Sequence, residues 1–500
     1  MNQGAVKERG RGRYDPTRAG KILVAVMVTL PALLGMLAIV IDGNGLMGQS
    51  EEMQQATDAA AQAAAVDLLQ GGGSGTATAT ANQYITNYNG STGASVAVHI
   101  PPQEGAYAGN SGFVEVVVTE PGRTFFSRAL EGVAAPTLSS RAVAGYAPST
   151  AGAALVVLDP SPAPLALPAT IPGVPALPSL PSLIGGLEVL GIGNLQVQGA
   201  VLVNTTWGGV DQNGDPAGSG PGPPYGIACT PLISLTRLLA TDIRVVGGVD
   251  NPANYGSVTA GKSSPLQANR LSVSDPWIDL PVPTMSVDPV NVSDTVYGGV
   301  QVTLLPLQQK TLNPGVYDWI EIDSGQVTFN PGVYIVRNVN PITGLALAVL
   351  GGQVTAAGTM FYITDNTVYS PDQGTPDNAD GSTAPAAAGI TTLVPSVVLN
   401  IGLPGSTFSA ISSPSSPFNG IVIFQRRFDR RPVILVQQQL VGGGSFTGSI
   451  YAKWAHVMLV GEGTFNVSVV AGTMRVVELL TCTIAPPSLL PPVQEVFLVE

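Results

Sequence analysis

The residues most able to do chemistry are four arginines in the second half of the chain. Residues 426–431 read Arg-Arg-Phe-Asp-Arg-Arg and form the only dense basic cluster outside the N-terminal leader. Guanidinium groups make planar, multidentate hydrogen bonds to phosphate and carboxylate groups. Arg426, Arg427, Arg430 and Arg431 are therefore candidate anion-binding residues, for a surface polysaccharide, a teichoic-type polymer or a lipid headgroup. The simpler interpretation is a solvated loop that joins two apolar strands.

A second candidate site is a weak one, at Asp211, Asn213 and Asp215. This spacing opens a calcium loop, in which oxygen atoms at positions 1, 3 and 5 converge on the ion. The rest of the pattern fails, because Pro216 stands where the loop needs glycine and Gly222 where it needs glutamate. A turn between strands is the expected structure, and neither a metal nor a cofactor is predicted.

The remaining reactive residues have no catalytic pattern around them. His99 and His456 are the only histidines, and neither has a partner motif nearby. A nucleophile elbow, a P-loop and an HExxH zinc motif are all missing from the sequence. A polysaccharide lyase needs a basic residue beside carboxylates, and no acidic residues visibly cluster with the arginines. The sequence therefore favours a non-enzymatic protein, with a lyase as the alternative.

The two cysteines, Cys229 and Cys482, lack any metal-ligand spacing such as C-x-x-C. An extracytoplasmic location would permit a disulfide between them. Their separation in the sequence says nothing about their distance in space, so a disulfide and two buried thiols both remain open.

The composition indicates which elements must position these residues. Gly (60) and Pro (42) are abundant and hydrophobic residues reach 45%, which is typical of many short strands joined by tight turns. A length of 500 residues predicts more than one domain. The net charge of −12 argues against a nucleic-acid surface, which needs clustered Lys and Arg.

A membrane anchor is predicted from Ile22 to Ile41, an uncharged apolar stretch with Pro31 near its middle. About 20 helical residues cross a bilayer. The preceding leader is basic and the following segment is acidic, so the positive-inside rule places the N-terminus in the cytoplasm and the bulk of the chain outside. A cleaved signal is the alternative, but its apolar region would be shorter.

An Ala-rich helix follows the anchor, with Met53, Ala56, Ala60, Ala63 and Val66 on one face. Gly43 and Gly45 are expected to interrupt the helix just outside the membrane, and the glycine run after residue 70 to end it. Residues 123–130 are expected to form a short helix with Phe126 and Leu130 turned inward.

Recurrent short β-branched runs without intervening helices dominate residues 191–480 and favour a β-solenoid, with a β-sandwich as the alternative. The motif Asn-Pro-Gly-Val-Tyr at residues 313–317 recurs at residues 330–334. The offset is close to the length of one strand and its adjoining turns in a solenoid coil. The predicted fold class is therefore mainly β. The predicted segments are a leader (1–21), a transmembrane helix (22–41), a helical stalk (42–70), a small α/β pilin-like head (76–148), a Pro-rich connector (155–190), a β-solenoid (191–480) and a Pro-rich tail (481–500).

The N-terminal region resembles that of the TadE/TadG-like Flp pilus-assembly proteins. The shared pattern is a basic leader, a span with a central proline, an Asp-Gly exit and an Ala-rich helix. Blocks at residues 155–161, 420–425 and 445–452 resemble the C-terminal region of long TadG-like members. Pilin-like relatives carry Glu at the fifth position after a processed glycine, whereas the fifth residue after Gly20 is Ala25. The residues that match the helix pattern are Gln55, Asp58, Ala59, Ala60, Ala61 and Ala64.

The resemblance implies a single-pass protein of the cytoplasmic membrane that acts in pilus assembly or surface attachment. Its implied partners are Tad/Flp secretion and pilus-assembly components. The apolar span adds the lipid bilayer and the arginine cluster a surface polysaccharide, while the net charge argues against nucleic acid. The alternatives are a β-solenoid that cleaves polysaccharide and one that binds ligands through a flat Thr/Ser/Asn face. The sequence itself shows no strict period for such a face.

Overall fold

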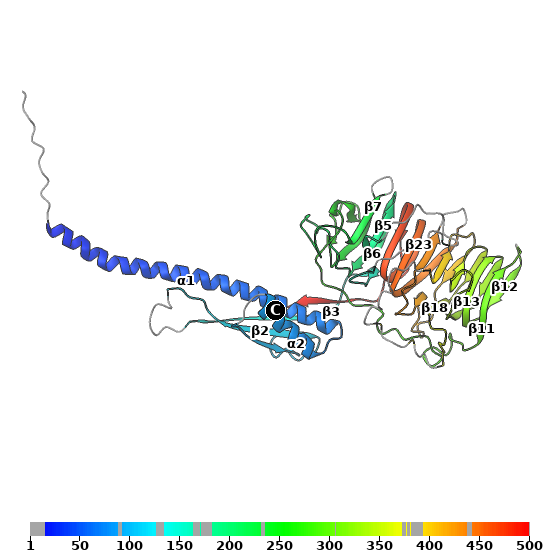
Figure 1. The fold of residues 1–500 in the computed structure, drawn as a ribbon, viewed down its shortest axis with the longest axis horizontal. Helices are drawn as coiled ribbons and strands as arrows, with labels where there is room; N and C mark the ends of the chain where they lie inside the picture. Colours follow the sequence, from blue (N-terminus) through cyan, green and yellow to red (C-terminus); the bar gives the residue numbers. More distant parts are fainter. Residues whose placement is uncertain are drawn as a thin grey trace, which may run out of the picture. The chain divides into compact units, whose positions relative to one another are not determined.

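The chain divides into two units in the computed structural model (Figure 1). Unit 1 comprises residues 1–146 and 497–500, and unit 2 comprises residues 147–496. The first 15 residues of the predicted leader lie outside the described part. The structure describes residues 16–88, 93–126, 135–163, 171, 183–231, 236–305, 307–372, 377, 381, 394–437 and 443–499.

Unit 1 begins with one long helix, α1 (Pro16–Leu69), in which the predicted span and stalk are continuous. The expected interruption at Gly43 and Gly45 does not occur. Each glycine costs a helix only about 1 kcal/mol, and side-chain contacts of Asp42 and Gln49 with residues 121–126 hold this stretch of α1. The expected end is confirmed. Gly71 adopts a left-handed φ of 83°, and the Gly72 N–H donates to the Asp67 carbonyl at 2.8 Å.

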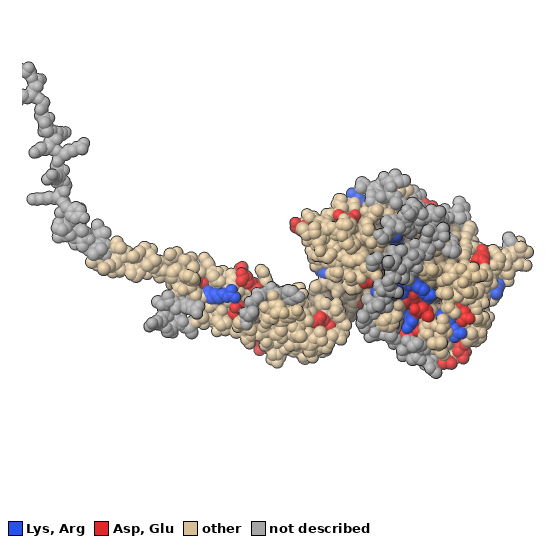
Figure 2. Space-filling view, in the orientation of Figure 1, with Lys and Arg blue, Asp and Glu red and all other residues tan. Residues whose placement is uncertain are grey.

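The two parts of α1 have opposite surroundings. From Val24 to Ile41 every side chain except that of Ala38 is exposed, and Figure 2 shows this stretch without charged atoms. It is the one helix among the described residues that is long and apolar enough to cross a membrane. An exposed helix that is apolar on all sides is typical of a membrane anchor or of a signal sequence.

The second part of α1 packs on unit 1 along a stripe of small side chains. Thr57 Oγ1 lies 2.5 Å from Ser140 Oγ on the neighbouring sheet. Of the five residues predicted to share one face of this helix, Met53, Ala56 and Ala60 are buried, whereas Ala63 and Val66 are half-buried. The buried positions are Asp42, Gln49, Met53, Ala56, Thr57, Ala60, Ala61, Ala64 and Ala65.

The rest of unit 1 is a small α/β head, as predicted. A short helix α2 (Ser74–Gln83) and a π-helical turn (Tyr84–Tyr88) precede a four-stranded sheet. The helix predicted over residues 123–130 is wrong for residues 123–126, which are irregular, and its remainder lies outside the described residues. The sheet has the order β1 (Ser95–His99), β2 (Phe113–Pro121), β3 (Thr137–Pro148) and β24 (Gln494–Leu498).

Unit 2 contains the large sheet of 20 strands. The predicted connector (155–190) contains parts of the first two strands of this sheet, and the predicted tail (481–500) contains the end of its last strand and all of β24, so these two boundaries are corrected. The strands are β4 (Ala153–Val157), β5 (Gly185–Gly191), β6 (Asn194–Val203), β7 (Tyr225–Pro231), β8 (Arg237–Val245), β9 (Tyr255–Ser257), β10 (Leu266–Gln267), β11 (Val296–Thr303), β12 (Gln309–Leu312), β13 (Gly315–Ser324), β14 (Gln326–Phe329), β15 (Gly332–Val336), β16 (Leu347–Val349), β17 (Gln353–Ala356), β18 (Thr359–Ile363), β19 (Val397–Asn400), β20 (Thr407–Ser409), β21 (Ile421–Gln425), β22 (Val433–Gln437) and β23 (Ser445–Ile484).

Three parallel ladders organise these strands. The first is β12–β14–β17–β20–β23, the second is β13–β15–β18–β21–β23, and the third is β13–β16–β19–β22–β23. The second and third ladders share β13 and β23, so their pairings close the sheet into a ring of eight parallel strands. A mainly β fold with an N-terminal apolar helix is confirmed, and the parallel pairing differs from that of an antiparallel sandwich.

The last strand of unit 2, β23, lies in the middle of the stack (Figure 1). On one side it pairs with β4, β5 and β6, and on the other with β20, β21 and β22. The chain therefore starts at the centre, builds one half outward to β10, crosses to β11 at the other end, and returns to the centre.

Inward side chains of all the ladders form one continuous apolar core. A second apolar cluster lies on the outer side of β15, β18, β21 and β23, where Val333, Met360, Tyr362 and Tyr451 are buried. We call this outer side the covered face. Residues 273–292 pack over it through Trp277, Leu280, Val282 and Val292, among others, and we call them the strap.

Candidate functional site

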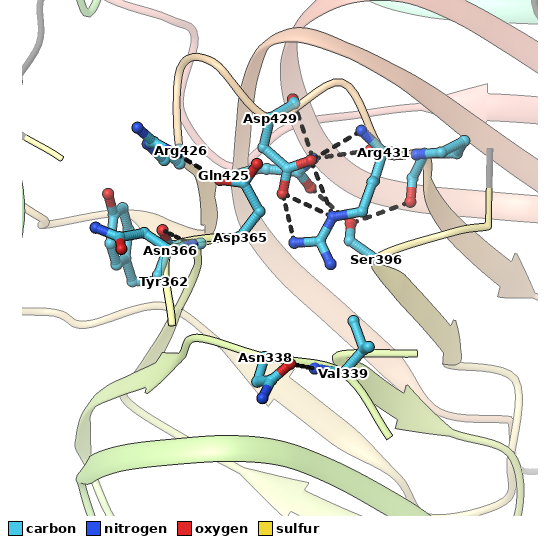
Figure 3. A network of polar contacts seen from close by, with 12 residues as sticks. Asn338, Val339, Tyr362, Asp365, Asn366, Ser396, Gln425, Arg426, Asp429 and Arg431 are labelled. Atoms are coloured by element: carbon cyan, nitrogen blue, oxygen red, sulfur yellow. Dashed lines mark hydrogen bonds and ion pairs between the residues drawn. The ribbon is translucent and has the colours of Figure 1, made fainter. Parts of the chain in front are cut away.

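The arginine cluster lies in the turn that connects β21, a strand of the second ladder, to β22, a strand of the third (Figure 3). The Arg426 N–H donates to the Ile363 carbonyl at 2.8 Å, and the Asp429 N–H donates to the Arg426 carbonyl at 2.9 Å. Gln425 closes the turn, because its Nε2 donates to the carbonyls of Asp429 and Arg431 at 3.2 and 2.8 Å. These hydrogen bonds fix the backbone of the turn, and with it the positions from which the arginine side chains extend.

Arg426 pairs with two aspartates that the sequence analysis did not connect with it. Its Nη1 lies 2.6 Å from Asp365 Oδ1, and its Nε lies 3.2 Å from Asp377 Oδ1. Asp377 is buried and also accepts hydrogen bonds from Tyr362 and Asn366. The expectation that no acidic residues cluster with the arginines is therefore wrong. Ile363 pairs with Gln425 across the ladder, which brings the residues after β18 beside those after β21.

Arg431 is held by the buried Asp429. Its Nη2 donates to Asp429 Oδ2 at 2.6 Å, and its Nε donates to both carboxylate oxygens at 3.0 and 3.1 Å. Burial raises the pKa of the Asp429 carboxyl, while the neighbouring Arg431 acts in the opposite direction. Arg430 completes the group with an ion pair to Asp159 at 3.4 Å.

Arg427 differs from its neighbours because it is buried and binds carbonyl groups of the strap. Its Nη2 donates to the carbonyls of Trp277, Ile278 and Leu280 at 2.9, 3.0 and 2.7 Å. Its Nε donates to the Tyr451 hydroxyl at 2.8 Å. The guanidinium therefore holds the strap against the covered face.

These contacts give each of the four predicted anion-binding arginines acceptors from its own chain. Figure 2 shows positive and negative side chains intermixed on the visible face of unit 2. Two of the three carboxylates nearest to Arg426 and Arg431 are buried, namely Asp377 and Asp429. Within the described part of the chain, no group of three or more His, Cys, Asp or Glu residues could hold a metal ion. The geometry suits a structural network, and anion binding stays a prediction.

The weak calcium candidate is a hydrogen-bonded turn. Asp211 Oδ1 accepts from the N–H groups of Asn213 and Asp215 at 2.8 and 3.0 Å. Cys229 and Cys482 are both buried thiols in the core of unit 2, and no disulfide joins them. His456 is buried with its Nδ1 2.9 Å from Thr473 Oγ1, and burial lowers its pKa to about 3.

The outer side of the first ladder carries a regular polar array that the sequence analysis missed. Thr311, Thr328, Thr355 and Thr407 pair in register on successive strands, and all four are exposed. A row of glutamines runs beside them, and Gln309 Nε2 donates to Gln326 Oε1 at 3.1 Å. We call the array the Thr/Gln face. It comprises Gln309, Thr311, Gln326, Thr328, Gln353, Thr355 and Thr407.

The sequence shows no regular period for the Thr/Gln face, because its threonines are unevenly spaced along the chain. Loops of different lengths separate the threonines along the chain, yet the ladder places them one strand apart, about 4.8 Å. Only the first step matches the repeat seen in the sequence. There Asn330 Nδ2 donates to Asn313 Oδ1 at 2.7 Å, which stacks the two Asn-Pro-Gly-Val-Tyr motifs.

Comparison with known proteins assigns the N-terminal helix. Residues 20–67 match the family described as putative Flp pilus-assembly TadE/G-like, so this part of the chain is a TadE/G-like domain. The match covers most of α1, including both its exposed apolar part and its packed part. Neither a curated protein nor a solved structure matches the chain.

Proposed function

We propose that the protein is a membrane-anchored, extracytoplasmic structural or accessory component of Flp (Tad) pilus assembly or surface attachment. The observation that carries the proposal is the TadE/G-like domain at residues 20–67, placed on a helix whose first part is apolar and exposed on all sides. The basic leader favours a cytoplasmic N-terminus, with both units outside the membrane. Its partners would be other Tad/Flp assembly components.

For unit 2 we propose a β-solenoid that serves as a rigid, non-enzymatic module of a long TadG-like protein. Support comes from parallel ladders in which the chain returns to each face every few strands. The arginine–aspartate network supports the same role, since its charges are engaged with one another instead of converging on an open site.

Localisation with protease treatment tests this proposal. In cells that express the full chain, units 1 and 2 should be cut by protease either in intact cells, if they lie on the surface, or once the outer layer is opened, if they lie beneath it. The apolar helix should stay membrane-bound. Leu33→Arg with Leu37→Arg should release the protein from the membrane, while Met47→Arg, exposed beyond the apolar stretch, should not. Protection of both units after the envelope is opened, with the membrane intact, would overturn the orientation.

A second candidate function, neutral-polysaccharide binding, is favoured by the Thr/Gln face. Its seven side chains are uncharged although the protein has a net charge of −12, so the face suits a neutral, hydroxyl-rich chain. Cosedimentation with insoluble cellulose and with a neutral β-glucan tests it. Thr328→Lys with Thr355→Lys should abolish retention, and Ser412→Lys, exposed elsewhere on unit 2, should not. Equal retention of both variants would remove this candidate.

A further inference from the structure

Two adjacent phenylalanines on unit 1 are exposed to an unusual degree. The side chain of Phe125 is 81% exposed and that of Phe126 is 39% exposed. Their rings contact each other edge to face, with centroids 5.6 Å apart. Large aromatic side chains normally account for much of a protein's buried area, so an exposed pair marks a contact surface.

Hydrogen bonds tie the backbone of this pair to α1 at the residue where the apolar stretch ends. Asp42 Oδ1 accepts from the N–H groups of Phe125 and Phe126 at 2.8 and 3.0 Å. Asp42 directly follows Ile41, the last exposed apolar residue of the predicted span, and is itself only 9% exposed. The pair is therefore held at the level where α1 would leave the hydrocarbon.

Further contacts fix the same segment one and two turns along α1. Gln49 Oε1 accepts from the Arg123 N–H at 2.7 Å, and Gln49 Nε2 donates to the Pro121 carbonyl at 3.2 Å. Gly122 sits so close to α1 that a Cβ there would lie 2.6 Å from Leu46 Cδ2. The strand end and the helix are thus joined firmly, and the phenylalanines extend the apolar surface of residues 24–41.

We propose that Phe125 and Phe126 form a second membrane contact, which inserts into the interfacial region of the leaflet from which α1 emerges. This inference rests on the proposed function, because it requires that α1 spans the bilayer. Aromatic rings at the level of the headgroups are favourable, and an apolar pair there would shield the end of the span from water. The contact would also fix the rotation of α1 about its own axis, since a single helix has no preferred side.

Site-specific fluorescence quenching of the full chain in liposomes tests the proposal. Phe125→Cys is labelled with the fluorophore NBD, and Cys229 and Cys482 are buried, so the unsubstituted chain gives the background. Lipids that carry a nitroxide near the headgroup should quench the label at residue 125 severalfold more than a label at Ala79→Cys. Ala79 is exposed on α2, which starts beyond the far end of α1.

A third label separates the failure of this inference from that of the proposed function. Leu33→Cys lies within the apolar stretch and should be quenched by nitroxides deep in the acyl chains. Quenching at residue 33 without quenching at residue 125 would overturn the second contact and leave the span intact. No quenching at residue 33 would overturn both.

A second experiment shows whether the rings themselves cause the contact. A label at Arg123→Cys, whose side chain is exposed, should be quenched by headgroup nitroxides in the presence of both phenylalanines. Phe125→Ser with Phe126→Ser should reduce that quenching to the level seen at residue 79. The matched pair Phe125→Leu with Phe126→Leu should retain it. Equal quenching in the Ser and Leu pairs would overturn the role of the apolar side chains.

Discussion

The covered face and the Thr/Gln face of unit 2 are built on neighbouring strands with the same core beneath them, yet their outer sides differ completely. In β15, β18 and β21 every side chain is buried, whereas β12, β14 and β17 alternate between buried and more exposed positions. Parallel strands that are covered on both sides read as continuous apolar runs, and strands with one wet side alternate. The comparison shows that buried and exposed side chains alternate along a strand only where no other segment covers its outer side.

The largest effect should come from separating the strap from the covered face. Arg427→Met would leave three strap carbonyls and the Tyr451 hydroxyl without their buried donor, so we expect a loss of about 3 kcal/mol in the free energy of unfolding. Urea unfolding of the full chain measures it. Arg237→Met, at an exposed position on β8, should change the value by less than about 0.5 kcal/mol. Similar small losses in both variants would mean that the strap is held by apolar packing alone.

The second effect is a pH dependence from His456, whose ring is buried on β23. Its pKa is lowered from an ordinary 6.5 to about 3, so the unfolded chain takes up a proton first as the pH falls. Stability from this residue is present above pH 6.5 and is lost progressively toward pH 3, by about 2 kcal/mol between pH 7 and pH 5. His456→Gln should lose less stability than the natural protein over that interval in denaturant titrations at both pH values. An unchanged slope would show that His456 is not the responsible group.

A smaller effect is expected at the corner where the two faces meet. The Tyr334 hydroxyl donates to the carbonyl of Asn330 at 2.7 Å and to that of Leu312 at 2.8 Å. Asn330 directly follows β14 and Leu312 ends β12, and both strands belong to the first ladder. Tyr334→Phe removes this link and should cost about 1 kcal/mol in thermal or chemical unfolding. Tyr297→Phe is the control, because this ring is partly exposed and stacks at the end of the same row. A larger loss for the control would contradict the corner's role.

The smallest effect on stability should come from the Thr/Gln face itself. Thr328→Val replaces an exposed hydroxyl by a methyl group in a strand, so the free energy of unfolding should stay within about 0.5 kcal/mol of the natural value. Retention on a neutral polysaccharide should nevertheless fall. The reverse exchange on the covered face, Ile335→Thr, should cost about 2 kcal/mol, because it buries a hydroxyl and removes a packed methyl group. Equal losses in the free energy of unfolding for Thr328→Val and Ile335→Thr would show that the two faces do not differ in burial.

Sequence reasoning predicted the local structure of this protein better than its long-range contacts. The apolar stretch, the Ala-rich helix, its end at the glycine run and the mainly β second half follow from patterns within about 20 residues. The short helix at residues 123–126 was wrong because Asp42, far away in the chain, binds the N–H groups of Phe125 and Phe126.

The candidate site shows the same limit. The four arginines were visible as a run of letters, but their partners Asp159, Asp365 and Asp377 are up to 271 positions distant. The register of β18 on β21 brings Asp365 to the turn after β21, and the fold of unit 2 brings the other two carboxylates there from more distant segments. The threonine ladder was hidden for the same reason, since loops of unequal length disguise equal steps in space.

The position of β23 at the centre of its stack has a consequence for how the chain is made. Its pairings with β4–β6 join residues nearly 300 or more positions apart, whereas its pairings with β20–β22 are much more local, and contacts of great sequence separation slow folding. Until residues 445–484 have left the ribosome, two half-built stacks each present an unpaired edge, which is the kind of surface that invites aggregation. The head also awaits β24, which completes its sheet. A chain that stopped within β23 would therefore leave both units unfinished at once, and quality-control proteases would meet an open edge in each.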